Sequence, residues 1–145
     1  LTSFRIKLGE GDLLDALKLS ADRFQSQTGL PVEMNIENDG APLPSEQELQ
    51  VLFIVQEALS NIRKHSHASR VRIDLKNDRD FVLNVYDNGV GFDQRQSGSV
   101  AEQHIGLKIM KERANQLNGN LSVISQINNG TTINLTIPHT TRIAA

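Results

Sequence analysis

Residues 81–91 constrain this chain most, because a strand-like pattern there runs directly into an acidic, glycine-rich turn. The apolar residues Phe81, Leu83 and Val85 occupy every second position, which is typical of a strand with one buried face. Asp87 continues the alternation, so its carboxylate is predicted to face the core. A buried carboxylate without a partner is costly, which favours a site that receives a hydrogen-bond donor such as an exocyclic amine. The alternative is that Asp87 only begins the turn that follows it.

The size and composition of the chain limit the remaining possibilities. A chain of 145 residues can bury one core, so a single domain is expected. The formal net charge of -2 provides no basic field, so direct binding to nucleic acid is not expected. The absence of cysteine excludes disulfides and thiolate zinc sites, and fits a reducing compartment. No apolar run approaches the roughly 20 residues that cross a bilayer.

Hydrophobic periodicity predicts an alternation of helices and strands. Ser45 and Glu48 have the spacing of a capping box at the start of the second helix. Residues 92–105 are polar and lack a period, so they are predicted to form a loop. The expected elements are helices over 12–28, 45–65 and 106–118, a strand over 32–36, and hairpins over 71–85 and 121–137. This order predicts a mixed sheet covered on one face by about three helices.

Four polar residues in the second predicted helix form the next candidate site. Glu57 and Asn61 are four residues apart, and Lys64 and His65 follow one turn later, so all four are expected on one face. The carboxylate and the amide could bind a hydrated magnesium ion, and Lys64 could meet an anionic phosphate. The alternative is an ordinary solvated helix face.

Two residues further along the chain have the character of ligand contacts. Gly106 is predicted to open the third helix, where free N–H groups and the helix dipole would cradle phosphates. The simpler interpretation is a glycine N-cap. Thr131 begins the last strand and could bond a ligand through its hydroxyl, although threonine also simply favours strands.

Several common sites are excluded. His65 and His67 are two residues apart and have no thiolate nearby, which argues against zinc. The chain has neither a P-loop motif nor a Gly-x-Ser-x-Gly elbow, so P-loop nucleotide binding and serine-hydrolase chemistry have no support.

Four of these segments, taken in chain order, resemble the ATP-binding domain of bacterial sensor histidine kinases, within the GHKL superfamily. They are Glu57–His65, Asp87–Gly91, His104–Ala114 and Gly130–Thr132, and the likeness extends from about residue 47 to 138. The resemblance is strongest to the subgroup that includes the nitrate/nitrite sensors. It implies the Bergerat ATP-binding fold, an α/β (α+β) sandwich, with ATP and Mg²⁺ as cofactors.

The resemblance also implies a role for each matching residue. Asp87 would accept from the adenine amino group, Gly89 and Gly91 would let the backbone close on the base, and Thr131 would help to hold it. Asn61 would bind magnesium, Glu57 would be the base or polarising carboxylate, and Lys64 and His65 would lie by the phosphates and ribose. Gly106 and Leu107 would offer backbone N–H groups to the phosphates, and residues 92–105 would form a lid.

Two departures from the family pattern stand out. The aromatic-rich lid box is missing, and no stretch resembles the helix that carries the phosphoacceptor histidine. Residues 1–11 are therefore expected to be the end of a dimerisation helix and a linker, residues 12–140 the catalytic domain, and residues 141–145 a tail.

These implications predict a catalytic domain that supplies the γ-phosphoryl of ATP to a histidine on a separate domain of the same protein. The expected partners are that dimerisation domain and a response regulator. The expected location is the cytoplasmic side of an inner-membrane homodimer. One alternative is a regulator of the anti-sigma-factor type that acts by protein binding or serine phosphorylation. Another is an interaction domain that has lost ATP binding.

Overall fold

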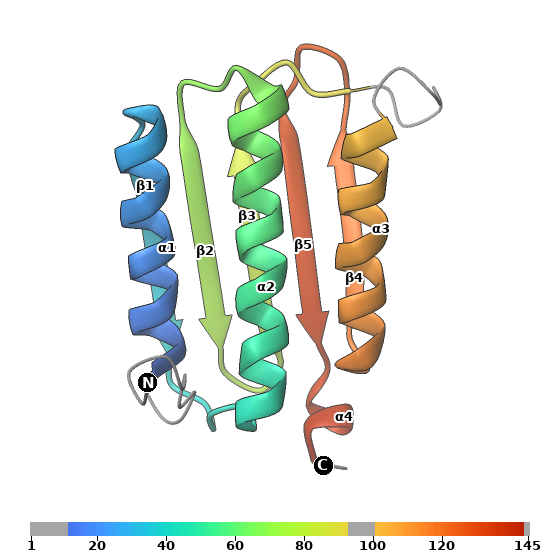
Figure 1. Cartoon of the computed structure of the whole chain (residues 1–145). Coiled ribbons are helices and arrows are strands. Elements are labelled where there is room, and N and C mark those ends of the chain that lie inside the picture. Colours follow the sequence, from blue (N-terminus) through green and yellow to red (C-terminus); the bar gives the residue numbers. More distant parts are fainter. Residues whose placement is uncertain (1–11, 93–100, 144–145) are drawn as a thin grey trace, which may run out of the picture.

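The computed structural model describes residues 12–92 and 101–143 (Figure 1). The helices are α1 (Asp12–Thr28), α2 (Ser45–Asn61), α3 (Ala101–Gln116) and α4 (His139–Ile143), and one π-helical turn (Ile62–Ser66) continues α2. The strands are β1 (Val32–Asn38), β2 (Val71–Asn77), β3 (Phe81–Asp87), β4 (Asn120–Ser125) and β5 (Thr131–Ile137). The expected helices and strands appear in the expected order, and α4 is an additional element that the sequence analysis does not predict.

The five strands form one mixed sheet in the order β1-β2-β3-β5-β4. β1 and β2 are parallel and are joined through α2, as a parallel pair requires a crossover. The other neighbours are antiparallel, and the hairpins β2–β3 and β4–β5 appear where the sequence predicts them. The pairing of β5 with β3 places Thr131 opposite Asp87.

The helices α1, α2 and α3 cover one face of this sheet, which confirms the predicted architecture (Figure 1). Every second residue of β2 and β3 is buried against them, and Asp87 occupies the last of these core-facing positions. The opposite face carries polar contacts between strands. Examples are Asn134 to Asn84 at 2.8 Å and Asn35 to Asp74 at 2.9 Å.

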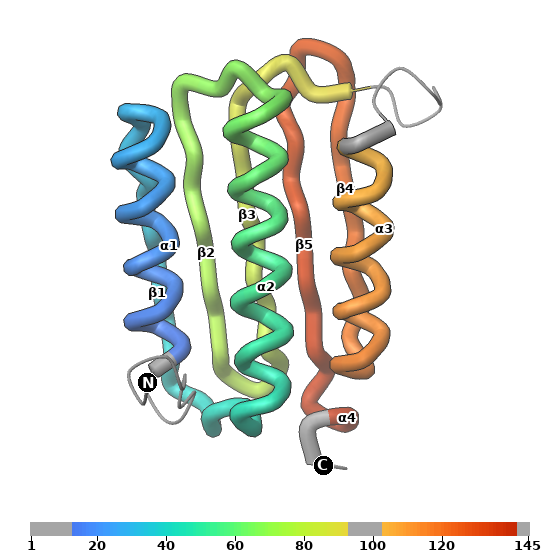
Figure 2. Tube along the Cα trace, in the orientation of Figure 1, coloured from blue at the N-terminus to red at the C-terminus, as the bar shows by residue number. Residues whose placement is uncertain are grey.

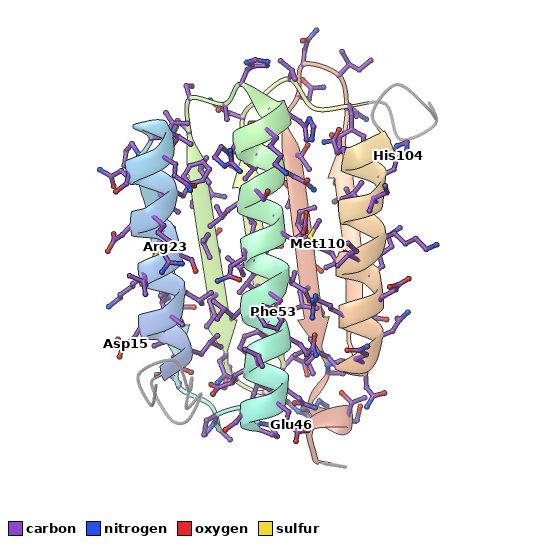
Figure 3. The ribbon with its side chains drawn as sticks, viewed as in Figure 1. Asp15, Arg23, Glu46, Phe53, His104 and Met110 are labelled. Atoms are coloured by element: carbon purple, nitrogen blue, oxygen red, sulfur yellow. The ribbon has the colours of Figure 1, made fainter. Side chains whose placement is uncertain are left out.

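The packing of α3 against α2 positions the functional site. Met110 is fully buried and extends from α3 into the space between these two helices (Figure 3). Arg113 of α3 stacks 4.5 Å above the ring of Phe53 and donates a 2.9 Å hydrogen bond to Gln50, both on α2. These contacts fix the two helices side by side.

The predicted capping box is not formed. Pro44 is the N-cap residue of α2, and no side chain makes a cap hydrogen bond there. Glu48 is instead almost completely buried, so it faces the core and does not reach back to the start of the helix. The motif matched by spacing alone, but proline in the cap position removes the backbone N–H that the glutamate would bind.

The described chain begins and ends at the same end of the sheet. α1 begins and α4 ends at the same end of the sheet, opposite the end where β3 runs into residues 88–91 (Figure 2). α4 crosses the boundary expected at residue 140, and residues 1–11 lie outside the described part, so the proposed domain limits stay predictions. In the described ranges, no helix has both the length and the apolar character that crossing a membrane requires.

The central strand offers a test of this core. Leu83 has no exposed surface, so Leu83→Ala is expected to lower the free energy of unfolding by about 2–5 kcal/mol through lost burial and a residual cavity. Urea denaturation measures this change. Ile124 on β4 is 64 % exposed, so Ile124→Ala is the control and should stay within about 0.5 kcal/mol of wild type. Equal effects of the two substitutions would contradict the described burial.

Candidate functional site

One pocket brings together residues from the end of α2, the end of β3, the start of α3 and the start of β5. Five of the predicted site residues line it, namely Asn61, Asp87, Gly91, Leu107 and Thr131. The other lining residues are Ala58, Ile62, Ser66, Val85, Phe92, Gln103 and Ile133. The segments that supply these residues are far apart in sequence, so the fold assembles the site.

Asp87 is the buried acid of this pocket. It is 3 % exposed, as the strand alternation predicts, and its Oδ1 accepts a 2.8 Å hydrogen bond from the Gly89 N–H. Burial raises the pKa of Asp87, and the hydrogen bond from Gly89 opposes that rise. The second carboxylate oxygen makes no hydrogen bond to another residue in the described part of the chain, so it can accept from a ligand.

The glycines of the motif allow close contacts within the protein. A Cβ at Gly89 would lie 2.2 Å from the carbonyl oxygen of Ser66. Gly91 has a φ of +61°, and a Cβ there would lie 2.0 Å from the carbonyl oxygen of Gln126. The loop therefore packs closely against both the π-helical turn after α2 and the β4–β5 turn. The contact of Gly89 and Gly91 with a base remains a prediction.

Glu57, Asn61 and Gly106 form a second cluster beside the pocket. A Cβ on Gly106 would lie 2.7 Å from Glu57 Oε2 and 3.1 Å from both Asn61 Oδ1 and Asn61 Nδ2. The two head groups therefore gather over the bare backbone of α3. Carboxylate and amide oxygens are suitable ligands for a hydrated magnesium ion, so the donor set fits the expected cofactor. Only a glycine leaves room for both groups.

The π-helical turn carries Lys64 and His65. Turns of this type occur often at functional sites, because they shift the side chains that follow out of α-helical register. Lys64 is exposed and His65 is half-buried, and neither lines the pocket. His65 Nε2 is buried without a hydrogen-bond partner in the described structure.

The predicted start of the third helix is wrong. α3 begins at Ala101, so residues 101–105 are helical and Gly106 is the sixth residue of the helix. Only the first four N–H groups of a helix lack partners, so those of Gly106 and Leu107 do not face outward here. Residues 93–100 of the predicted lid lie outside the described part.

The pocket is closed in this conformation. Its free space is about 20 Å³, which holds roughly one water molecule and no nucleobase. Gln103 and Leu107 of α3 line it together with Phe92. The sequence predicts a loop at Gln103, which is instead helical, and does not single out Ser66, whose carbonyl accepts a 2.7 Å hydrogen bond from the Val90 N–H. No sequence pattern marks Ser66, since it acts through its carbonyl.

Within residues 12–92 and 101–143, no group of three or more histidine, cysteine, aspartate or glutamate side chains could hold a metal ion. Any metal bound here would therefore depend on amide oxygens and on oxygens of the ligand itself.

Comparison with known proteins places these features in context. Residues 46–141 match the family model described as histidine kinase-, DNA gyrase B- and HSP90-like ATPase. The chain is 38 % identical over 138 residues to the signal transduction histidine-protein kinase/phosphatase DegS of Brevibacillus brevis, covering 94 % of the chain and 35 % of that protein. It is 36 % identical over 143 residues to the nitrate/nitrite sensor protein NarX of Escherichia coli K12, covering 97 % and 23 %. The chain thus spans about a quarter to a third of these relatives.

Solved structures show the same fold. The histidine kinase domain of the Erythrobacter litoralis EL346 blue-light activated histidine kinase superposes with a TM-score of 0.67 at 21 % identity. The match covers 91 % of this chain and 63 % of that one. At 21 % identity this comparison shows that the two chains share a fold.

The buried carboxylate predicts an unusual pH dependence of stability. Because the folded pKa of Asp87 is raised, its contribution is most favourable at low pH and is lost as pH rises from about 3.8 through the raised value. Asp87→Asn keeps an acceptor for the Gly89 N–H, and because asparagine does not ionise, the variant does not lose this stability as pH rises. The melting temperature of the variant should exceed that of wild type, by more at pH 7.5 than at pH 4. Circular dichroism measures both, and a variant that melts lower at pH 7.5 would contradict the assignment.

Proposed function

Because the chain belongs to the family of histidine kinase-, DNA gyrase B- and HSP90-like ATPases, we propose that it is the catalytic domain of a sensor histidine kinase. In this proposal the domain binds Mg-ATP and supplies the γ-phosphoryl group to a histidine on a separate dimerisation domain. From there the group passes to an aspartate of a response regulator. The names of the relatives DegS and NarX support this reading over an anti-sigma-type regulator.

The observation that carries the proposal is the buried Asp87 carboxylate, which has one oxygen held by Gly89 and the other free. Inside a pocket, such a carboxylate recognises a group that can only donate, and the exocyclic amine of adenine is such a group. Thr131, paired with Asp87 across β3 and β5, adds a hydroxyl at the same end. The sheet therefore provides the purine end of the site.

The helices provide the phosphate end. Asn61 would hold Mg²⁺, which when bound neutralises charge on the phosphates of ATP. Glu57, beside Asn61 and Gly106, orients or deprotonates the attacking group. Lys64 meets a phosphate with its exposed side chain, and the free Nε2 of His65 hydrogen bonds to the ribose or to a phosphate. Catalysis here consists mainly of positioning and charge neutralisation.

Nucleotide binding requires a change at the start of α3. The free space of about 20 Å³ cannot admit adenine while Gln103 and Leu107 line the pocket. If the helix unwinds to Gly106, the pocket opens, and the N–H groups of Gly106 and Leu107 become free for phosphates. The same movement would thus open the purine end and complete the phosphate end.

The intact protein in this proposal is a membrane-bound homodimer, with this domain on the cytoplasmic side of the inner membrane. Its partners are its own histidine-bearing domain and a response regulator. Direct contact with nucleic acid is not part of the proposal, because the formal net charge is -2.

Titration calorimetry with Mg-ATP tests the nucleotide site. Asp87→Asn replaces the free carboxylate oxygen by an amide, which weakens or reverses the hydrogen bond to the adenine amine. Loss of a hydrogen bond to a charged group is worth about 1.5–3 kcal/mol, so the affinity should fall about 10- to 100-fold. Asp15→Asn, on the exposed side of α1 (Figure 3), is the control and should bind as wild type. Absence of ATP binding by the wild-type chain would overturn the proposal.

Gly106→Ala tests the phosphate end. The new methyl group displaces the flexible Glu57 head group and Asn61, while alanine is the better helix former by up to about 1 kcal/mol. The melting temperature should therefore stay unchanged. The affinity for ATP in the presence of Mg²⁺ should fall about 10- to 100-fold, as for other disturbed metal sites. Lys111→Ala, exposed on the same helix, serves as the matched control. Unchanged affinity would exclude this cluster from the site.

A further inference from the structure

Ser125, the last residue of β4, has a buried hydroxyl just behind the wall of the pocket. Its Oγ accepts a 2.9 Å hydrogen bond from the Phe92 N–H, lies 2.7 Å from Thr131 Oγ1, and lies 3.2 Å from the carbonyl oxygen of Gly130. Phe92 and Thr131 both line the pocket, whereas Ser125 does not. Any influence of Ser125 on a ligand therefore passes through these two neighbours.

The number of hydrogens that the Ser125 hydroxyl can donate determines the direction of its hydrogen bonds. A serine hydroxyl has one hydrogen to donate and two lone pairs. The carbonyl of Gly130 can only accept, so the Ser125 hydrogen must point to it if that contact is a hydrogen bond. The 2.7 Å contact is then donated by the hydroxyl of Thr131. With the Phe92 N–H, this arrangement uses every donor and acceptor of Ser125.

The opposite arrangement is less favourable. If Ser125 donated to Thr131, the 3.2 Å contact with Gly130 would no longer be a hydrogen bond. A buried carbonyl that loses a donor costs free energy, so the arrangement with one more hydrogen bond prevails. Thr131 therefore directs its hydrogen away from the pocket, and the lone pairs of its hydroxyl remain for a ligand.

We infer that Ser125 is a positioning residue that makes Thr131 an acceptor, so that Asp87 and Thr131 together select a purine with an amino group at position 6. This inference rests on the proposed nucleotide site. The amino group of adenine offers two hydrogens, which two acceptors at this end of the pocket can receive directly or through water. A purine with an oxo group at position 6 offers only lone pairs there, so inosine triphosphate should be rejected.

The same hydroxyl also holds the backbone at the pocket mouth. Its bond to the Phe92 N–H fixes the first residue after the motif loop, and Phe92 is itself buried against the pocket. Removing the hydroxyl would release both Phe92 and the rotation of Thr131. Loosening of Phe92 affects all nucleotides equally, whereas freeing the Thr131 hydrogen affects only the choice between amino and oxo purines.

The test compares the dissociation constants of ATP and inosine triphosphate, each with Mg²⁺, for the full 145-residue chain. Wild type should prefer ATP, and Ser125→Ala should reduce this preference about tenfold, because Thr131 can then donate to an oxo group. Ser122→Ala, exposed on the same strand, should leave the ratio unchanged. Adding Ser125→Ala to Thr131→Val should change the ratio no further, since Ser125 acts through Thr131.

Ser125→Cys provides a second variant of nearly the same volume that hydrogen bonds weakly, so its preference for ATP should fall between those of wild type and Ser125→Ala. The inference is overturned if either variant weakens both nucleotides equally, because that result indicates a purely structural role. It is also overturned if wild type binds both nucleotides equally, or if the ratio does not change. A wild-type chain that binds no ATP would instead refute the proposed function itself.

Discussion

The pocket depends on how tightly the loop after β3 is held between two other parts of the chain. The Val90 N–H donates to the carbonyl of Ser66 at the end of the π-helical turn, and the Val90 carbonyl accepts a 2.6 Å hydrogen bond from the Asn128 N–H in the β4–β5 turn. The two motif glycines let the backbones meet at these points. Because the loop is fixed on both sides, Asp87 has a single position relative to α2 and β5.

The two ends of the site differ in how they are supported. The proposed purine end lies on paired strands, where Asp87 and Thr131 are held opposite each other by the register of β3 and β5. The proposed phosphate end lies on the facing sides of α2 and α3, where Glu57 and Asn61 meet Gly106. A sheet changes shape less readily than the end of a helix, so in the proposed function any adjustment to the nucleotide falls on the start of α3. Burial of Asp87 lowers stability at neutral pH, as is common where function requires a buried charge.

Strand periodicity was sufficient to predict the sheet and the inward position of Asp87, because a period of two fixes the face of each residue. The predicted boundary of α3 is wrong because residues 101–105 show no apolar stripe, although glutamate, glutamine and alanine form helices well. The predicted capping box does not form, because Pro44 occupies the N-cap position and the spacing of Ser45 and Glu48 takes no account of it. Ser125 could not be recognised from sequence, since its partner Phe92 is 33 residues away.

In the proposed function, Asp87, Thr131 and the Glu57–Asn61–Gly106 cluster belong to one Mg-ATP site. The most direct test is a titration of the ¹⁵N-labelled chain with Mg-ATP, followed by backbone amide chemical shifts. A single site gives saturable shifts with one affinity at Gly89, Thr131 and Gly106, and none at Asn84 on the opposite face of the sheet. Shifts confined to other regions, or different affinities at Gly89 and Gly106, would contradict it.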